Sequence, residues 1–269
     1  MPPMDFDFDQ IAVPFRMQPG LRRLAGGTPQ LTSLDPTGAL YAEKRQVVEA
    51  GRSRLAVSGF DPSPALEAIA AQARADGIAL APGQVPELAV EEDFAVLDGD
   101  SATLPWLSVC VPSHWAPEEK LGLSFGAVHA PVADNALLQA AGEQLVRLAT
   151  GGERWERFVW TITPSRRYGQ HPHRQAREPW PDPADASAFA ARCFLRAERQ
   201  TFFPVGRGTR QAVFTIRVML EPLTDSVRTR AQAERLHDAL ASMSETVLAY
   251  KGLTPAREPL LRWLRERAA

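Results

Sequence analysis

The sequence predicts a single-domain protein of the α+β class, with an antiparallel sheet flanked by helices. Three observations support this class. Two strand patterns separated by a glycine-containing turn predict a hairpin, the order of elements is not a βαβ alternation, and no low-complexity linker divides the 269 residues. A chain of this length buries a sizeable core, so residues 1–269 are expected to form one domain with the helices gathered on one side of the sheet.

The first half of the chain is expected to supply helices and a buried strand. Apolar residues recur at helical spacing in Tyr41–Val57 and in Ala65–Ala75. The segment Trp106–Val111 is almost wholly apolar and is typical of a buried strand. Before these elements, Phe6 and Phe8 are expected to dock an N-terminal arm on the body.

A helix and a strand are expected near the middle of the chain. Asp134 or Asn135 can cap a helix whose apolar residues recur at steps of three and four up to Gly151 and Gly152. In Arg157–Thr163, large apolar side chains alternate with other residues, which predicts a strand.

A hairpin and two helices are expected to close the chain. Cys193–Phe203 and Ala212–Leu220 are the two strands of the hairpin. An apolar stripe over Leu236–Tyr250 predicts one helix that ends at Gly252, and Thr254 and the proline after it begin the last helix.

Residues 164–183 hold five prolines and four arginines with no periodicity, which predicts a long surface excursion. We set the bounds of this excursion at residues 164–187 and expect it to act as a loop or lid. It contains His171 and His173, which on an extended loop can share a metal ion. The alternative is a polar loop with two solvated imidazoles, because no cysteine or carboxylate cluster lies nearby in the sequence.

Composition excludes several classes of function. The formal net charge of −2 gives no electrostatic case for nucleic acid, although basic residues concentrate between Arg147 and Arg217 and can bind a carboxylate. The N-terminus lacks a secretory signal and no stretch is apolar enough for a membrane span, so a cytoplasmic protein is expected. Cys110 and Cys193 lie in apolar runs, which indicates buried, reduced thiols.

Common catalytic signatures are absent: the sequence has no P-loop, H-E-x-x-H, G-x-S-x-G or C-x-x-C motif. Chemistry would therefore require a bound cofactor. Of the histidines, His129 is distinctive because it lies in the apolar run Leu121–Val132 just before the predicted helix. Such a residue is either a hydrogen-bonded core histidine or a haem ligand, since an axial imidazole is neutral and held by its other nitrogen. His114 and His237 are weaker candidates.

Arg217 also occupies an unusual place, in the middle of an apolar strand pattern. An inward-facing arginine requires an anion. Two partners are possible: a carboxylate of the chain, Glu198 or Glu221, or a carboxylate of a cofactor.

Six short motifs follow one another along most of the chain. They are Asp93–Leu97 (DFAVL), Val111–Gly122 (VPSHWAPEEKLG), Val128–Val132 (VHAPV), Arg196–Thr201 (RAERQT), Phe214–Arg217 (FTIR) and Tyr250–Gly252 (YKG). In this order they resemble the family of haem-dependent oxidative N-demethylase α subunits, also described as dimethylamine monooxygenase-like.

The resemblance implies a PAS-like antiparallel sheet that holds a b-type haem, with His129 as the axial ligand and metal-binding residue. It implies oxidation of an N-methyl group of a small secondary amine to formaldehyde. The electrons would come from NADPH through FMN and a 2Fe–2S cluster on partner subunits. We expect two arginines and three aromatic residues beside the haem. They are Arg199, Arg217, Trp115, Phe125 and Trp160.

The sequence departs from the family pattern in three places. Ala133 stands where the family has a second proline, and Val159 stands where it has an asparagine. An acidic-Leu-Leu and Tyr-Pro segment is not recognisable between Asp61 and Leu88. These departures leave open a second function, a non-catalytic PAS-like protein that binds haem or a small ligand as a sensor.

Overall fold

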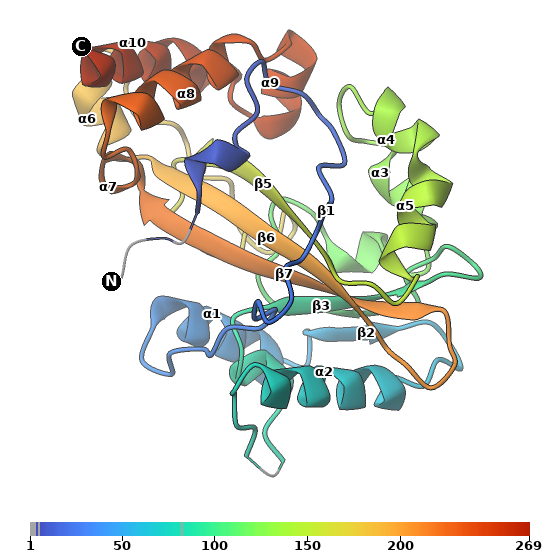
Figure 1. The fold of residues 1–269 in the computed structure, drawn as a ribbon. Helices are drawn as coiled ribbons and strands as arrows, with labels where there is room; N and C mark the ends of the chain where they lie inside the picture. Colours follow the sequence, from blue (N-terminus) through green and yellow to red (C-terminus); the bar gives the residue numbers. More distant parts are fainter. Residues whose placement is uncertain (1–3, 5, 82) are drawn as a thin grey trace.

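The computed structural model describes Met4, residues 6–81 and residues 83–269, and its strands form one antiparallel sheet (Figure 1). The strand order is β1-β5-β6-β7-β3-β4-β2. The strands are β1 (Arg22–Arg23), β2 (Arg54–Ala56), β3 (Asp93–Asp98), β4 (Trp106–Ser108), β5 (Trp155–Thr163), β6 (Phe194–Pro204) and β7 (Gln211–Pro222). The α-helices of the described residues are α1 (Ala39–Glu49), α2 (Ser63–Ala75), α3 (Phe125–His129), α4 (Ala136–Ala140), α5 (Gly142–Ala149), α6 (Ala186–Ala190), α7 (Leu223–Ser226), α8 (Arg230–Ala241), α9 (Glu245–Lys251) and α10 (Arg257–Ala268). The α+β class and the single antiparallel sheet are confirmed.

Helices cover both faces of the sheet, so the expectation that they gather on one side is wrong. Figure 1 shows α8 to α10 at one end of the sheet and α2 at the other. These helices pack on one face, whereas α1 and α5 contribute to clusters on the opposite face. The reason lies in β7, where neighbouring residues such as Ala212 and Val213, or Val218 and Met219, are both buried. Because strand side chains alternate between faces, both faces need a cover.

The hairpin prediction is confirmed by β6 and β7. These strands pair from Phe194 opposite Pro222 to Pro204 opposite Ala212. The turn between them has φ angles of 85° at Gly206 and 73° at Gly208, a left-handed conformation that glycine adopts at little cost.

The strand predicted over Trp106–Val111 is shorter than expected and ends at Ser108. The backbone N–H groups of Cys110 and Val111 donate to the Asp93 carboxylate, at 2.9 and 2.7 Å, instead of to a neighbouring strand. Lys44 lies 3.2 Å from the other oxygen of Asp93 and is fully buried. A side-chain acceptor therefore replaces the strand ladder and turns the chain toward the following segment.

The helix predicted over Tyr41–Val57 ends at Glu49, and its second half is wrong. Gly51 has a φ angle of 65°, which stops the helix, and Leu55 belongs to β2. Leu55 pairs with Leu107 and packs in a cluster on the sheet, so tertiary packing decides its conformation.

Two further helices are divided. The helix expected after Asn135 consists of α4 and α5, which meet at Ala141. The stripe over Leu236–Tyr250 consists of α8 and α9, because the hydroxyl of Ser244 accepts from Val247 N and begins a second helix. Gly252 ends α9 at a φ angle of 67°, as predicted. The last helix begins at Arg257, after a short 3-10 turn over Thr254–Ala256.

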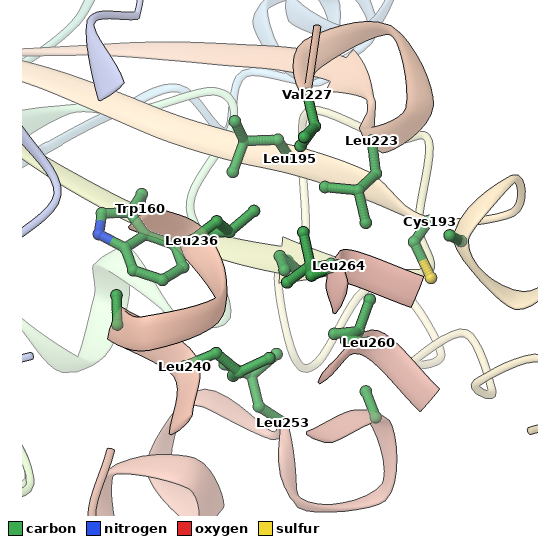
Figure 2. Packing of buried hydrophobic residues seen from close by; sticks show 14 of the residues in the cluster. Trp160, Cys193, Leu195, Leu223, Val227, Leu236, Leu240, Leu253, Leu260 and Leu264 are labelled. Atoms are coloured by element: carbon green, nitrogen blue, oxygen red, sulfur yellow. The ribbon is translucent and has the colours of Figure 1, made fainter. Parts of the chain in front are cut away.

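The largest hydrophobic cluster lies between the sheet and the C-terminal helices. Figure 2 shows Trp160 and Leu195 of the sheet facing Leu236 and Leu264 of α8 and α10. Phe6 and Phe8 are each 7% exposed and belong to this cluster, which confirms that the arm docks on the body.

We expect Leu264→Ala to lower the free energy of unfolding by about 2–5 kcal/mol, because Leu264 is fully buried and its truncation leaves a cavity. Urea denaturation measures this loss. Leu137→Ala is the control, since Leu137 is 62% exposed and should change stability by less than about 0.5 kcal/mol. Equal losses in the two variants would contradict the packing in Figure 2.

Glu92 is a fully buried carboxyl group beside β3. One of its oxygens accepts from Thr32 N at 3.0 Å, and the other has no hydrogen-bond partner. Burial raises the pKa of Glu92 to about 7, against the opposing effects of the Thr32 hydrogen bond and of the charges on Arg217 and Lys44.

The folded protein should therefore lose stability as the pH rises. Between pH 4.5, the ordinary pKa of a glutamate, and about pH 7, the folded state keeps a proton on Glu92 that the unfolded state has lost. We expect Glu92→Gln to remove this loss and to be more stable than the parent at pH 8 by roughly 2 kcal/mol. Urea denaturation from pH 5 to pH 8 tests this. The matched Glu143→Gln, at a 94% exposed side chain, should keep the parent profile.

The two cysteines are free and buried, as predicted. Burial raises the pKa of both thiols, Cys110 and Cys193, so they remain protonated at neutral pH. Within the described residues, no helix combines the length and the apolar character that crossing a bilayer requires.

Candidate functional site

The centre of the sheet has one face that is only partly covered, and we call it the site face. Strand alternation and register place Arg157 opposite Gln200 and Val159 opposite Glu198 on this face. Arg157, Val159 and Gln200 stay partly exposed, although β5 and β6 lie inside the sheet. Inner strands are usually covered on both faces, so this partly exposed patch is a candidate place for a bound group.

His129 is the last residue of α3 and lies beside the site face. Its Nδ1 is 2.7 Å from the carbonyl oxygen of Phe125. A carbonyl can only accept, so Nδ1 carries the proton and Nε2 keeps a free lone pair. Burial lowers the pKa of His129, the Phe125 hydrogen bond opposes this, and the charges of Arg157 and Lys120 lower it further. The ring is therefore neutral at pH 7, which is the form that binds a metal.

The C-terminal end of α3 is tied to two other helices. Asn135, expected to cap a helix, instead donates from its side-chain amide to the carbonyl oxygens of His129 and Ala130, at 3.0 and 3.1 Å. The carboxylate of Asp134 accepts from the hydroxyls of Ser244 and Thr246 at the start of α9. These bonds fix the position of His129 relative to α4 and α9.

Arg157 is a cation without a partner. Its Nε atom is shielded from solvent and has no hydrogen-bond partner, and no carboxylate of the described residues lies within ion-pair distance of it. Burial lowers the pKa of Arg157, against the charges of Glu198 and Tyr250. Trp155, two residues earlier on the same face, has an indole N–H that also lacks a partner. Two unsatisfied donors side by side are costly in the free protein and call for an anionic ligand.

The nearest acid on the site face is already engaged. Glu198 is 9% exposed and accepts hydrogen bonds from Ser113 and, at 2.7 Å, from Gln200. Ser113 also accepts from the guanidinium of Arg196, at 2.7 and 2.9 Å. Glu198 therefore belongs to a hydrogen-bond network with Ser113 and Gln200 and does not pair with Arg157.

Of the expected site residues, Trp115 and Phe125 lie on the side of His129. The Phe125 ring centroid is 4.2 Å from that of His129, with the planes at 37°. Trp115 is half-buried and packs with Phe214, whose side chain lies on the site face. Phe125 packs on a neighbouring cluster with Phe202, and the Phe202 and Phe214 ring centroids are 4.7 Å apart, so Phe125 and Trp115 belong to adjoining apolar clusters.

Trp160, Arg199 and Arg217 lie elsewhere. Strand alternation places all three on the opposite face of the sheet, and Trp160 is buried in the C-terminal cluster (Figure 2). Arg199 pairs with Glu156 at 3.0 Å, and Arg217 pairs with Glu91 at 2.6 Å. These three residues are not brought together with His129.

The carboxylate partner of Arg217 differs from both residues expected from the sequence. Glu198 bonds Ser113 and Gln200, and Glu221 pairs with Arg228 at 2.7 Å. The strand register explains the difference, because Glu198 lies on the site face and cannot reach an arginine on the other.

The excursion after β5 has no helix or strand until Asp185 caps α6, so its end lies before the expected residue 187. It is more firmly attached than a surface loop. His171 is 5% exposed and bonds Glu118 at 2.9 Å, and His173 bonds Glu119 at 2.7 Å. Among the described residues, no three His, Cys, Asp or Glu side chains are grouped to hold a metal ion. Each histidine has a glutamate as its partner.

Arg157 is the site residue that sequence reasoning missed. The strand pattern put it on the face opposite Phe158 and Trp160, where a charged residue looks solvent-exposed. A signal did exist, because Glu156 is the one acidic residue of this strand segment and alternation directs it to the opposite face, which leaves Arg157 without an acidic neighbour on its own face of the strand. An arginine on an inner strand without such a neighbour is a candidate for ligand binding.

A comparison with protein-family models matches residues 70–261 to one family, described as haem-dependent oxidative N-demethylase, alpha subunit-like. The matched region contains α3, the site face and the excursion after β5, and it covers more than two thirds of the chain. The chain therefore belongs to the haem-dependent oxidative N-demethylase, alpha subunit-like family.

Proposed function

We propose that this chain binds haem b through His129 and acts as the haem-bearing subunit of an oxygenase. Its substrate would be a small secondary amine of the dimethylamine class, demethylated with release of formaldehyde. The observation that carries the proposal is the hydrogen bond from His129 Nδ1 to the Phe125 carbonyl, which leaves Nε2 free for an axial iron bond.

The residues of the site fit a haem group. A haem needs one neutral imidazole and cationic or N–H donors for its carboxylates. His129 offers the first, and the unpartnered donors of Arg157 and Trp155 offer the second. Bound haem would supply the activation of oxygen, which no side chain of the chain can perform.

The other residues of the site would favour the unprotonated form of the amine substrate. An amine must lose its proton before its lone pair is available, and an apolar surrounding disfavours the ammonium form. Phe125, which lies against His129, and Trp115 and Val159 of the site face would together provide such a surrounding. They would also keep water away from the reacting methyl group.

We further propose that the sheet is PAS-like. Support comes from its topology: β3 and β4 form one hairpin, and the β5-β6-β7 meander returns to place β7 beside β3. The helices α3 to α5 lie between β4 and β5, so the connection between the two parts carries His129.

The alpha-subunit description implies a complex of several subunits. We propose that partner subunits deliver electrons from NADPH through FMN and a 2Fe–2S cluster, and that the chain works in the cytoplasm. The excursion over residues 164–185 would act as a lid beside the site.

Haem titration followed by an amine-oxidation assay tests this function. We expect the purified chain to acquire a Soret band at one haem per chain, and then to release formaldehyde from dimethylamine with a surrogate reductase and NADPH. No Soret band would refute haem binding altogether.

Val159, which offers no hydrogen bond to a substrate, favours a second candidate, a PAS-like haem or small-ligand sensor. A Soret band without amine-dependent formaldehyde would support that candidate.

A further inference from the structure

Lysine is rare in this chain. Of 30 basic residues only three are lysines: Lys44, Lys120 and Lys251. An amine can lose its proton and act as a nucleophile, whereas a guanidinium remains charged. The three lysines also differ in surroundings, which makes each of them informative.

Lys251, at the end of α9, has no carboxylate partner among the described residues. Its Nζ donates to the carbonyl oxygen of Trp160 at 2.8 Å and lies 5.5 Å from the ring centroid of Phe15. Burial lowers the pKa of Lys251 to about 8, with Glu198 opposing the shift and Arg157 adding to it. Lys44 is the opposite case, because it is fully buried, pairs with Asp93 and donates to three backbone carbonyls.

Lys251 borders a cavity of about 20 Å³ at the end of β5. Thr161 and Thr163 also line this cavity, together with His114, whose pKa is lowered to about 4 by burial and by the charges of Arg177 and Arg196. The cavity holds about one water molecule, so a one-carbon unit matches it in size. Its lining supplies hydroxyl groups and a neutral imidazole around the amine.

The excursion after β5 closes this cavity. Pro164, Arg177 and Trp180 line it, and the indole N–H of Trp180 donates to the carbonyl oxygen of Gly252 at 3.1 Å. The guanidinium of Arg177 lies against Gly252 and occupies the space that a Cβ atom would need there. The turn that follows Lys251 is thus held by the same segment that roofs the cavity.

We propose that Lys251 is a covalent capture site for a one-carbon aldehyde, and this rests on the proposed function, whose product is formaldehyde. The neutral amine adds to the carbonyl carbon, and the C=O electron pair goes to oxygen, which takes a proton. Loss of water from this carbinolamine gives a methylene iminium on Nζ. The sum is one amine, one formaldehyde and one proton giving one iminium and one water, with no oxidation or reduction in the chain.

The site suits this chemistry in size and in position. The volume of the cavity favours formaldehyde over larger aldehydes, and the capture is reversible by addition of water. Thr161, which lines the cavity, follows Val159 on the same face of β5, so the cavity adjoins the proposed oxidation site. A reactive product would be held there before its transfer or release.

Reductive trapping tests the proposal on the full chain. The protein, with and without haem, is treated with dilute formaldehyde and cyanoborohydride at pH 7.5, and methylation of each lysine is followed by peptide mass spectrometry. A pKa of about 8 instead of 10.5 gives roughly a hundredfold more neutral amine. We therefore expect Lys251 to be methylated at least about tenfold faster than Lys44, and faster than the half-buried Lys120.

Size selectivity and a variant complete the test. Butyraldehyde should label Lys120 but not Lys251. Lys251→Arg keeps a cationic donor for the Trp160 carbonyl. This variant should lose only the fast phase of methylation, and the midpoint of its urea unfolding should be nearly unchanged. Methylation of Lys251 as slow as that of Lys44 in the haem-free chain would overturn the capture site. This result is independent of the Soret titration, so the failure of one proposal is distinguishable from the failure of the other.

Discussion

Replacement of His129 by alanine is expected to abolish the Soret band of the ligated haem, or to weaken haem binding by at least about a hundredfold. The physical reason is that His129 alone combines a neutral ring, a free Nε2 and a position beside the unpartnered Arg157. Haem titration followed by absorbance measures the effect. Added imidazole should restore much of the band, because the side chain removed leaves a space of the right shape.

His173→Ala is the matched control for this experiment. His173 is an exposed histidine of the excursion whose ring already bonds Glu119, so its nitrogen has a partner in the free protein. Its removal should leave the spectrum and the haem affinity unchanged. An unchanged spectrum in His129→Ala would instead assign the iron to another histidine, and His114 would be tested next.

Elements whose pattern and packing agree could be predicted from the sequence. In β6 and β7, the turn glycines and the strand propensity both indicate one hairpin, and the position of the turn sets the pairing of the two strands. The docking of Phe6 and Phe8 could be predicted in the same way, since burial of large aromatic side chains is favourable even near a terminus. His129 could be singled out for the same reason, as a polar ring in an apolar run.

Contacts made by side chains distant in sequence could not be predicted. The end of β4 depends on Asp93, whose carboxylate takes two backbone donors that a strand would otherwise use. The face on which an arginine lies depends on register, and a shift by one residue exchanges the faces. The sequence alone therefore favours Arg199 and Arg217 as neighbours of His129, whereas both are paired with glutamates on the opposite face of the sheet, and it gives no special weight to Arg157.

Arg157→Leu is expected to have opposite effects on the free protein and on haem binding. Without a ligand, Arg157 is a largely buried cation with no partner, so leucine should raise the free energy of unfolding of the haem-free chain by roughly 1 kcal/mol or more. Loss of a charge-assisted contact to a haem carboxylate should weaken haem binding about tenfold to a hundredfold. Urea denaturation of the haem-free protein and haem titration measure the two effects separately.

Arg199→Leu is the control, because Arg199 lies on the strand next to Arg157 but on the opposite face and is already paired with Glu156. Its loss removes a partner from a buried carboxylate, so the haem-free chain should be destabilised while haem affinity stays unchanged. If Arg157 has only a structural role, Arg157→Leu should behave like Arg199→Leu, with lower stability and normal haem binding. If Arg157 instead serves to bind an anionic ligand, its replacement makes the haem-free chain more stable and haem binding weaker. The sign of the change in the free energy of unfolding therefore distinguishes the two roles.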